Sequence, residues 1–443
     1  STSLETSRIV AASSRRWFPL CRLWGGGLMV SRRTRRQATL FSRLGSQLRD
    51  ALQNSRGVRR AQGQIDFTLL AVVAVLLILG IDMVYSASFI IAHNSPLYQS
   101  DVYFLTRQVI WVAVGAVGMF ITMNIDYHHW RRFSVLFFVV VLLMLIAVVA
   151  TPLGHSAYGA QRWLSLGPLP PVQPSEFAKL AIILYTAAWL SGRPGRAASL
   201  THGAIPFALI VGLTGGLVLA QKDLGSAFIV IAVGACLFFI GGADVRHFLA
   251  GMVVGGAALV WAIFVADYRV DRIEAFRDPT RDPLGLGWQA IQTNIALGSG
   301  GVLGLGLGAS RQKYYWLPAA HTDNIFAVIG EEVGLVGTLL VVALFVLLGY
   351  RGYRAMMAAP DDFGRLLAGG ITGWITLQAV VNMAAVTSLI PFTGITLPFV
   401  SSGGSSMVVT LVSVGMLLNI SRYEGVTRLG SGRRRGTTSG KVN

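Results

Sequence analysis

Long apolar segments recur along the whole sequence and restrict what it can fold into. A helix needs about 20 apolar residues to cross the hydrocarbon core of a bilayer, which is roughly 30 Å thick. Ten segments approach that length, near residues 67–91, 107–125, 133–151, 177–192, 204–221, 225–242, 247–266, 324–349, 365–388 and 404–421. Only 13% of the residues are charged and the mean hydropathy is +0.60, whereas soluble domains carry about 25% charged residues. The sequence therefore excludes a soluble enzyme and predicts an all-α polytopic membrane protein with ten transmembrane helices.

The positive charge is concentrated at one end of the chain. The sequence has 37 Lys and Arg against 20 Asp and Glu, which gives a formal net charge of +17. Thirteen arginines precede the first apolar segment, with only three acidic residues among them. Such a tail suits anionic lipid headgroups better than DNA, so we expect a membrane partner and no nucleic acid. The predicted domains are a basic, disordered cytoplasmic tail at 1–66, a membrane domain at 67–421 and a basic cytoplasmic tail at 422–443.

Arginines in the short loops indicate the orientation, because cytoplasmic loops carry the excess of Lys and Arg. Both tails and the loops at 131–132, 193–196 and 351–365 carry that excess, so both termini are expected in the cytoplasm. The long polar loop 267–323, between helices 7 and 8, is then extracytoplasmic. Residues 288–297 are expected to form a short interfacial helix within it. Long loops of this kind are often functional.

The long loop combines carboxylates with arginines. Activation of a sugar hydroxyl needs a carboxylate base within hydrogen-bond reach, and a lipid pyrophosphate needs cations or a metal. Asp278 and Asp282 can supply the first, and Arg277 and Arg281 can supply the second. Both aspartates precede a proline, however, and this pattern also favours a simple turn. On the local sequence alone, the turn is the better interpretation.

Charged residues also lie inside the apolar segments, where they are costly and usually mark a cavity, a pair or a pathway. Glu331 and Glu332 lie in the eighth segment, and Glu176 and Lys179 open the fourth. We interpret a Glu and Lys pair as the lining of an internal cavity. A purely structural ion pair between helices is the equal alternative. Lys222, which an aspartate follows directly, has the same two interpretations.

The stretch between the last two apolar segments, from Pro391 to Ser406, is rich in Pro, Gly and Ser. Irregular backbone at membrane depth is tolerated where it is buried in protein or lines a wet cavity. Its hydroxyls therefore indicate a substrate-facing re-entrant turn, and a polar hairpin at the surface is the alternative.

No two histidines have the spacing of zinc ligands. A carboxylate-bound Mg²⁺ or Mn²⁺ beside a pyrophosphate would leave little trace in the sequence, so a divalent cation stays open as a cofactor. No organic cofactor is expected.

Several of these stretches together resemble a known family. They are residues 83–88 (Met-Val-Tyr-Ser-Ala-Ser), Arg162-Trp163, 173–180 (Gln-Pro-Ser-Glu-Phe-Ala-Lys-Leu), 221–225, 282–289, 320–323 (Ala-His-Thr-Asp), Glu331-Glu332 and 403–406 (Gly-Gly-Ser-Ser). They span nearly the whole apolar part and are similar to the SEDS family (shape, elongation, division and sporulation), whose FtsW and RodA branches are ten-span peptidoglycan polymerases. Ala320 and the stretch 330–332 look more like FtsW. Asn324 and Ser402 stand where an aromatic residue is usual.

The resemblance implies an enzyme of the bacterial cytoplasmic (inner) membrane that polymerises lipid II into glycan strands during septal cell-wall synthesis, with its active face outside. It implies that Asp282 is the catalytic carboxylate of an inverting transfer. In this reaction the GlcNAc 4-hydroxyl of the acceptor attacks the anomeric carbon of the lipid-linked strand, and undecaprenyl pyrophosphate departs. Arg162, Glu176, Lys179 and Glu332 would line the cavity that holds lipid or sugar.

Further substrate-binding candidates come from the same stretches and, for the two loop arginines, from their charge. They are Lys222, Arg277, Arg281, Gln289, His321, Asp323 and Ser405. The partners implied are lipid II, the nascent glycan strand, other divisome proteins and a cognate class B penicillin-binding protein, an FtsI-like transpeptidase that contacts helices 8 and 9.

Three other functions compete with this one. A lipid II flippase or transporter is the first, because ten spans with intramembrane Lys and Glu could form a translocation path. The predicted gathering of charged groups toward the outer half of the membrane argues against it. A RodA-type elongation polymerase is the second. The third is a non-enzymatic scaffold that recruits a transpeptidase, for which Asp282 could be changed freely.

Overall fold

The computed structural model describes residues 63–94, 100–157, 160–165, 167, 170–193, 195–265 and 267–423. Nearly all of the predicted tails at 1–66 and 422–443 therefore lie outside the described residues.

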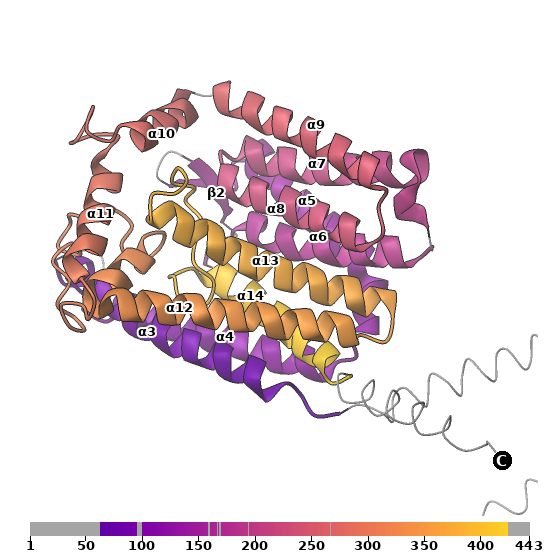
Figure 1. Cartoon of the computed structure of the whole chain (residues 1–443), viewed down its shortest axis with the longest axis horizontal. Coiled ribbons are helices and arrows are strands. Elements are labelled where there is room, and N and C mark those ends of the chain that lie inside the picture. The colour runs from indigo at the N-terminus through magenta and orange to yellow at the C-terminus, as the bar shows by residue number, and fades with distance from the viewer. Residues whose placement is uncertain are drawn as a thin grey trace, which may run out of the picture. The chain divides into compact units, whose positions relative to one another are not determined.

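Helices occupy all ten predicted apolar segments. They are α3 (Phe67–Asn94), α4 (Tyr103–Asn124), α5 (His128–Ala150), α6 (Pro174–Ser191), α7 (Ile205–Ala220), α8 (Leu224–Ile240), α9 (Val245–Phe264), α12 (Ile325–Ala358), α13 (Asp362–Val386) and α14 (Gly404–Ser421). These helices run side by side in one bundle (Figure 1). Among the described residues, eight helices are long and apolar enough to cross a membrane, with η3 (Leu200–Ala204) extending α7. The other two fall short, because α8 has only 17 residues and α6 contains Glu176 and Lys179.

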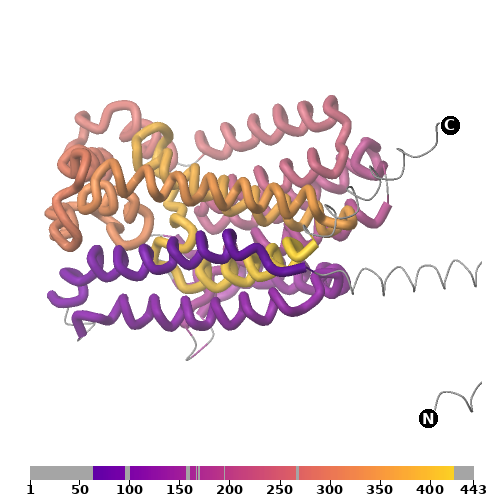
Figure 2. The backbone as a smooth tube through the Cα atoms, turned by 60° about the horizontal axis from the view of Figure 1, so that its bottom comes forward, coloured from indigo at the N-terminus to yellow at the C-terminus, as the bar shows by residue number. Residues whose placement is uncertain are grey.

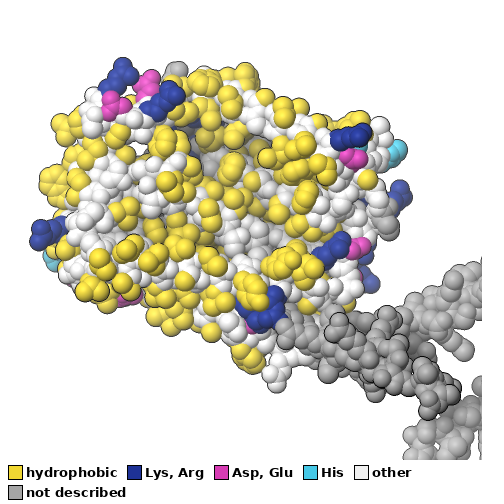
Figure 3. All heavy atoms as spheres, viewed as in Figure 1, with side chains coloured by type: hydrophobic (Ala, Val, Ile, Leu, Met, Phe, Trp, Pro, Cys, Tyr) yellow, Lys and Arg dark blue, Asp and Glu magenta, His cyan; other side chains and the backbone are white. Residues whose placement is uncertain are grey.

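The surface of the bundle matches this composition. Hydrophobic side chains cover most of the face seen in Figure 3, and the Lys, Arg, Asp and Glu side chains gather near the two ends of the bundle. The helices differ strongly in burial: 72% of the apolar window of α13 and of α14 is buried, against 6% for α9. The core therefore lies around α13 and α14, and α9 lies at the edge of the bundle.

Small residues bring α4 and α14 into close contact, as is common between helices in lipid. Gly415 has no room for a side chain, because a Cβ atom there would lie 2.0 Å from Thr122 Oγ1 and 2.4 Å from the Met119 carbonyl oxygen. The Thr122 hydroxyl also donates a hydrogen bond of 2.9 Å across the interface to the Val412 carbonyl. The two backbones therefore approach each other more closely than larger residues would permit.

The described chain enters and leaves the bundle at the same end (Figure 2). The Gly63 N–H donates a hydrogen bond of 2.9 Å to the Arg422 carbonyl. Asp66, which the sequence assigned to the tail, is buried, forms a 2.6 Å ion pair with Arg351 and accepts hydrogen bonds from the N–H groups that open α3. Residues 63–66 and 422–423 therefore lie at the same end of the bundle, and the side of the membrane on which the tails lie stays a prediction.

Short elements cover the opposite end of the bundle. They are the antiparallel strands β1 (Gly154–Ala157) and β2 (Ala160–Leu164) and the helices α10 (Asp267–Arg277) and α11 (Trp288–Gly300). The short helix predicted at 288–297 is confirmed as α11. The strands and α10 were not predicted, although Val270, Ile273 and Phe276 recur at the three-residue spacing of an apolar helix face.

The helix α12 is broken near its start, where a single continuous span was expected. Gly334 has φ 72° and ψ −163°, which is not helical. The segment 301–306 inserts at this break: the N–H groups of Leu335 and Val336 donate to the carbonyls of Gly301 and Val302, at 3.0 and 3.2 Å. In return, the carbonyls of Glu331 and Glu332 accept hydrogen bonds from this segment. Broken helices are tolerated at membrane depth when neighbouring protein satisfies the freed backbone groups in this way.

We predict that Gly415→Leu lowers the free energy of unfolding by about 1 to 3 kcal/mol, because overpacking a filled interface forces its backbones apart. Gly256→Leu is the matched control, since Gly256 is also helical but a Cβ atom there meets nothing within 4 Å. Both changes carry the same gain in helix propensity. Thermal unfolding of the two variants in one detergent compares them, and equal midpoints would contradict the close packing of α4 and α14.

Candidate functional site

Asp282 lies on an exposed turn, residues 278–287, that joins α10 to α11. Its carboxylate accepts hydrogen bonds from the N–H groups of Gly285 and Leu286, at 3.1 and 3.0 Å. Gly287 closes the turn, because a Cβ atom there would lie 1.9 Å from the Pro279 carbonyl oxygen. The interpretation of this stretch as a turn is therefore correct, and it is compatible with chemistry. A carboxylate has about four acceptor positions, so Asp282 keeps capacity for a substrate proton after these two bonds.

The other aspartate of the turn has a local role. Asp278 accepts hydrogen bonds from the Thr280 hydroxyl and the Thr280 N–H. The hydroxyl contact lowers the pKa of the Asp278 carboxyl. Asp278 and Asp282 thus share one exposed turn and provide a natural pair for comparison.

Asp323 lies in the turn before α12, among charges from three other elements. Burial raises the pKa of Asp323 to about 6, while Arg162 on β2 and Arg272 on α10 lower it and Asp223 at the start of α8 raises it further. His321 lies in the same turn, where burial lowers its pKa to about 4 and its ring packs 4.9 Å from that of Phe104. The site therefore holds a neutral histidine beside a carboxyl group that changes its charge in the mildly acidic range.

The Arg162 guanidinium donates a hydrogen bond of 2.6 Å to the Lys222 carbonyl. This bond fixes the cation at the end of the bundle that carries Asp323. Lys222 adopts a positive φ of 59° between α7 and α8, and its side chain is exposed. The aspartate after it, Asp223, is buried and accepts from the Ser175 hydroxyl at 3.3 Å and from the Ser226 N–H at 3.0 Å. The Asp223 carboxylate is therefore bound to Ser175 and Ser226, and the exposed Lys222 side chain forms no ion pair with it among the described residues.

The predicted pairing of an intramembrane lysine with a glutamate is present at the start of α6. Lys179 Nζ lies 2.7 Å from Glu176 Oε1 and 2.9 Å from Gln378 Oε1. Trp374 also donates to Gln378, at 2.7 Å, and all four side chains are buried. The ion pair joins two residues of α6 rather than two helices, and Lys179 reaches α13 through Gln378. That the pair lines a cavity stays a prediction.

The stretch between α13 and α14 folds back into the bundle. Leu397, Phe399 and Ser401 are buried. The Asn382 amide donates hydrogen bonds of 2.8 Å to the carbonyls of Asp323 and Ile395, which ties this stretch to the turn before α12. The prediction that this stretch is re-entrant is therefore confirmed and a polar hairpin at the surface is wrong, while its contact with substrate stays a prediction. Ser405 begins α14, and its hydroxyl accepts from the Gln173 N–H at 3.1 Å.

Glu331 and Glu332 bind the inserted part of the long loop. Glu331 accepts from the Ser310 hydroxyl and from the Arg311 N–H, at 2.5 and 2.8 Å. Glu332 accepts from the Ser86 hydroxyl at 2.6 Å and forms a buried ion pair with Lys313 at 3.2 Å. The structure therefore places Glu332 against protein groups on several sides.

The remaining predicted residues are exposed or half-buried. Arg277 is exposed at the end of α10, and Arg281 forms an exposed ion pair of 3.5 Å with Glu274. Gln289 is half-buried on α11. The structure thus buries Glu176, Lys179 and Glu332 in contacts with other protein groups. It leaves Asp282, Arg277 and Arg281 exposed.

Several polar residues at this end were not predicted. Gln378 and Asn382 lie four residues apart, which places them on one face of an apolar helix, and this spacing could have revealed them. Lys313 and Arg272 lie in a polar stretch rich in charge, so the sequence did not indicate which carboxylates they accompany.

In the described part of the chain, no three His, Cys, Asp or Glu side chains gather in a group that could hold a metal ion. The exposed carboxylate of Asp282 is the group here that fits such an ion, since Mg²⁺ is usually held by one or two carboxylates together with substrate phosphates.

Comparison with known proteins gives a consistent result. Residues 67–425 match the family FtsW/RodA/SpoVE, described as cell cycle protein. A relative from Trichlorobacter lovleyi, named probable peptidoglycan glycosyltransferase FtsW, is 43% identical over 358 residues, which cover 81% of this chain and 93% of that protein. Stage V sporulation protein E of Bacillus subtilis is 39% identical over 358 residues, covering 81% of this chain and 97% of that protein.

Solved structures agree with these relatives. A chain from a study titled structural coordination of polymerization and crosslinking by a peptidoglycan synthase complex is 30% identical, with a TM-score of 0.66 over 81% of this chain and 98% of that one. The rod shape determining protein RodA of Thermus thermophilus is 29% identical, with a TM-score of 0.59 over 81% of this chain and 97% of that one.

We predict that Lys313→Met lowers the free energy of unfolding by about 3 to 5 kcal/mol, because it leaves the buried Glu332 carboxylate without its cation. Arg281→Met is the matched control in the same loop. It breaks an exposed pair with side chains 76% and 55% accessible, and such pairs contribute little to stability. Denaturant unfolding in detergent measures both, and a Lys313→Met variant as stable as the control would contradict a structural role for the pair.

We also predict a pH-dependent contribution of Asp323 to stability. Between its ordinary pKa of 3.8 and the raised value of about 6, the folded chain keeps a proton that the unfolded chain has lost. The free energy of unfolding therefore falls as the pH rises through this window and levels off above it. Unfolding midpoints across the window should show this slope in the original chain and a smaller one in Asp323→Asn. Equal slopes would contradict the raised pKa.

Proposed function

This chain belongs to the FtsW/RodA/SpoVE family, and on that premise we propose that it is a peptidoglycan glycosyltransferase that polymerises lipid II into glycan strands for the septal cell wall. The observation that carries the proposal is the exposed Asp282 carboxylate, held by two backbone N–H groups on the turn between α10 and α11. A fixed carboxylate with spare acceptor capacity can serve as a general base.

The reaction transfers a lipid-linked strand to the next lipid II. The Asp282 carboxylate takes the proton of the acceptor's GlcNAc 4-hydroxyl while that oxygen forms a bond to the anomeric carbon of the donor strand. The bond from this carbon to the pyrophosphate oxygen breaks on the opposite side, so the anomeric configuration inverts. The electron pair leaves with undecaprenyl pyrophosphate. A divalent cation, when bound, would neutralise the charge of the departing pyrophosphate.

The cationic residues at the end of the bundle that carries Asp282 support the binding of an anionic substrate. Arg162, Arg272 and Arg277 belong to the end of the bundle that carries α10, α11 and the strands. Cations that lie where pyrophosphate charge develops stabilise it through charge-assisted hydrogen bonds. We assign Arg277 and Arg281 to phosphate contacts and Lys222, His321, Asp323 and Ser405 to the substrate side of the same end.

The orientation of the chain in the membrane follows from the arginine-rich loops, which lie at the end of the bundle opposite to α10 and α11. We propose that all ten long helices cross the bacterial cytoplasmic membrane, with α6 and α8 shielded from lipid by their neighbours. Both termini then lie in the cytoplasm, and Asp282 lies on the extracytoplasmic side. A class B penicillin-binding protein is the expected partner, and a contact with α12 and α13 is the surface we assign to it.

The septal role is favoured over elongation by the relatives. The FtsW and SpoVE proteins above are 43% and 39% identical to this chain, against 29% for RodA. A flippase is the second candidate, supported by the buried Lys179–Glu176 pair in a membrane helix. A flippase also needs polar groups through the full membrane depth, and the pairs formed by Lys179 and Lys313 both lie near the end that carries α11.

The test is polymerisation of lipid II by the purified chain, reconstituted in liposomes with its cognate penicillin-binding protein. We expect Asp282→Asn to reduce the rate at least 100-fold, since a general base contributes about 10² to 10⁴. Asp278→Asn is the matched control on the same turn and should keep the original rate.

Equal rates for Asp282→Asn and the original chain would remove the base assignment. Transfer of lipid II between leaflets without polymer from any variant would instead establish the flippase.

A further inference from the structure

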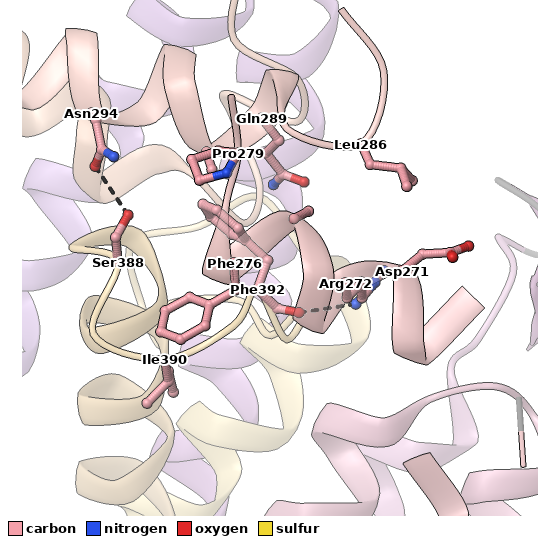
Figure 4. Close-up of a pocket in the computed structure, with 12 residues that line it drawn as sticks. Asp271, Arg272, Phe276, Pro279, Leu286, Gln289, Asn294, Ser388, Ile390 and Phe392 are labelled. Carbon is pink, nitrogen blue, oxygen red and sulfur yellow. Dashed lines mark hydrogen bonds between the residues drawn. The ribbon is translucent and has the colours of Figure 1, made fainter. Parts of the chain in front are cut away.

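A cavity of about 140 Å³ lies beside the turn that carries Asp282. It is lined by α10, by α11 and by the stretch that follows α13, which lies far from the two consecutive helices in the sequence (Figure 4). Pro279 and Leu286, from the two ends of the Asp282 turn, line the same cavity. Asp282 itself is not among the lining residues, but it belongs to the turn whose two ends form part of the wall.

The walls combine aromatic rings with amide groups. Phe276 of α10 and Phe392 of the stretch after α13 supply apolar faces, and Gln289 and Asn294 of α11 supply amides. The face of an aromatic ring carries partial negative charge, which suits the C–H groups of a sugar ring. A few placed polar groups in an otherwise apolar pocket are the usual means of fixing a ligand's orientation.

The hydrogen bonds already made leave specific donors open. Asn294 Oδ1 accepts from the Ser388 hydroxyl at 3.0 Å, which fixes the amide and leaves its Nδ2 group without a partner among the described residues. No described residue bonds to the Gln289 side-chain amide, which lies near Pro279 in Figure 4. Arg272 is already engaged, because its guanidinium donates to the Phe392 carbonyl at 3.1 Å. The open groups of α11 are thus neutral amides, which suit an uncharged polar ligand better than a phosphate, and the Asp271 carboxylate of the lining points away from them in Figure 4.

Size restricts the ligand further. A closed cavity of roughly 150 Å³ admits a molecule the size of benzene, so this partly open cavity of about 140 Å³ can enclose one part of a sugar, such as its acetamido group, while the rest of the ring lies at the opening. Two amides that can donate and accept match the acetamido group of a hexosamine, whose carbonyl accepts and whose N–H donates.

We propose that this cavity is the subsite for the N-acetylhexosamine ring of the acceptor, with Asn294 and Gln289 binding its acetamido group. The inference rests on the proposed polymerase function and adds to it the place where the acceptor sugar binds. The proposal also accounts for the position of the turn between α10 and α11, because a ring held at the cavity would direct its 4-hydroxyl toward the Asp282 carboxylate on that turn.

The experiment measures sugar binding and polymerisation separately on the full chain in detergent. The binding probe is the disaccharide GlcNAc-MurNAc, followed by saturation-transfer NMR on its acetamido methyl groups, with the de-N-acetylated disaccharide as the negative probe. The double variant Gln289→Ala, Asn294→Ala should lose most of the saturation-transfer signal of the disaccharide. It should also raise the KM for lipid II about tenfold at unchanged kcat, as expected for the loss of two hydrogen bonds. Ser299→Ala is the matched control, because its hydroxyl bonds only within α11.

Asp282→Asn separates the subsite from the chemistry. It should keep the NMR signal while polymerisation stops. Binding of the disaccharide by a chain that makes no polymer would support the cavity and overturn the polymerase. Polymerisation with an unchanged KM and unchanged transfer in the double variant would overturn the cavity and leave the polymerase standing. A further outcome is a double variant that binds the sugar normally and loses only the stimulation of its polymerisation by the penicillin-binding protein. That result would show that the cavity is a partner contact and would also overturn the proposal.

Discussion

The contact between the long loop and the broken start of α12 holds together the end of the bundle that carries the candidate site. Backbone groups freed by a break in a membrane helix must find partners inside the protein, because lipid offers none. Here the segment 301–306 provides them, and the side chains of Glu331 and Glu332 then bind residues 308–313 of the same loop. Gly334 makes this possible, because a Cβ atom there would lie 2.4 Å from the Gly304 nitrogen.

The position of Asp282 depends on this contact through α11. Gly300 at the end of α11 packs directly on the α12 backbone, where a Cβ atom would lie 1.9 Å from the Gly330 carbonyl oxygen. At the other end of α11, the Trp288 indole donates a hydrogen bond of 2.8 Å to the Trp316 carbonyl. The helix that follows the Asp282 turn is thus fixed at both ends. A carboxylate on an exposed turn can therefore keep a defined place although it has few contacts of its own.

The sequence predicted those features that depend on local pattern. Ten apolar segments follow from hydropathy alone, and α11 follows from the apolar residues that interrupt the long loop. The Glu176–Lys179 pair also follows from spacing, since residues three apart meet on one helix face. These predictions succeed because the responsible residues are close together in the chain.

Features that depend on distant residues could not be predicted in the same way. The ion pair of Lys313 with Glu332 joins a loop to a helix, and the Ser86 hydroxyl that joins it comes from α3. Glycine is common in membrane helices for packing reasons, so Gly334 did not indicate a break. Arg162 lies on β2, and this strand and β1 are too short to produce a clear alternation of apolar and polar residues. Lys222, whose carbonyl accepts a hydrogen bond from Arg162, is 60 residues away.

The division between buried and exposed charges suggests how such a protein can be both stable and active. A carboxylate whose acceptor positions are filled by protein groups, as in Glu331 and Glu332, stabilises the fold but has little capacity left for a substrate. Asp282 is in the opposite situation, since two backbone N–H groups orient it and leave the rest of the carboxylate accessible. If a buried, fully bonded carboxylate served as the base, each turnover would have to break the contacts that hold the long loop. Placing the base on a turn that α11 fixes from outside avoids that conflict, because proton transfer then changes no interaction on which the fold depends.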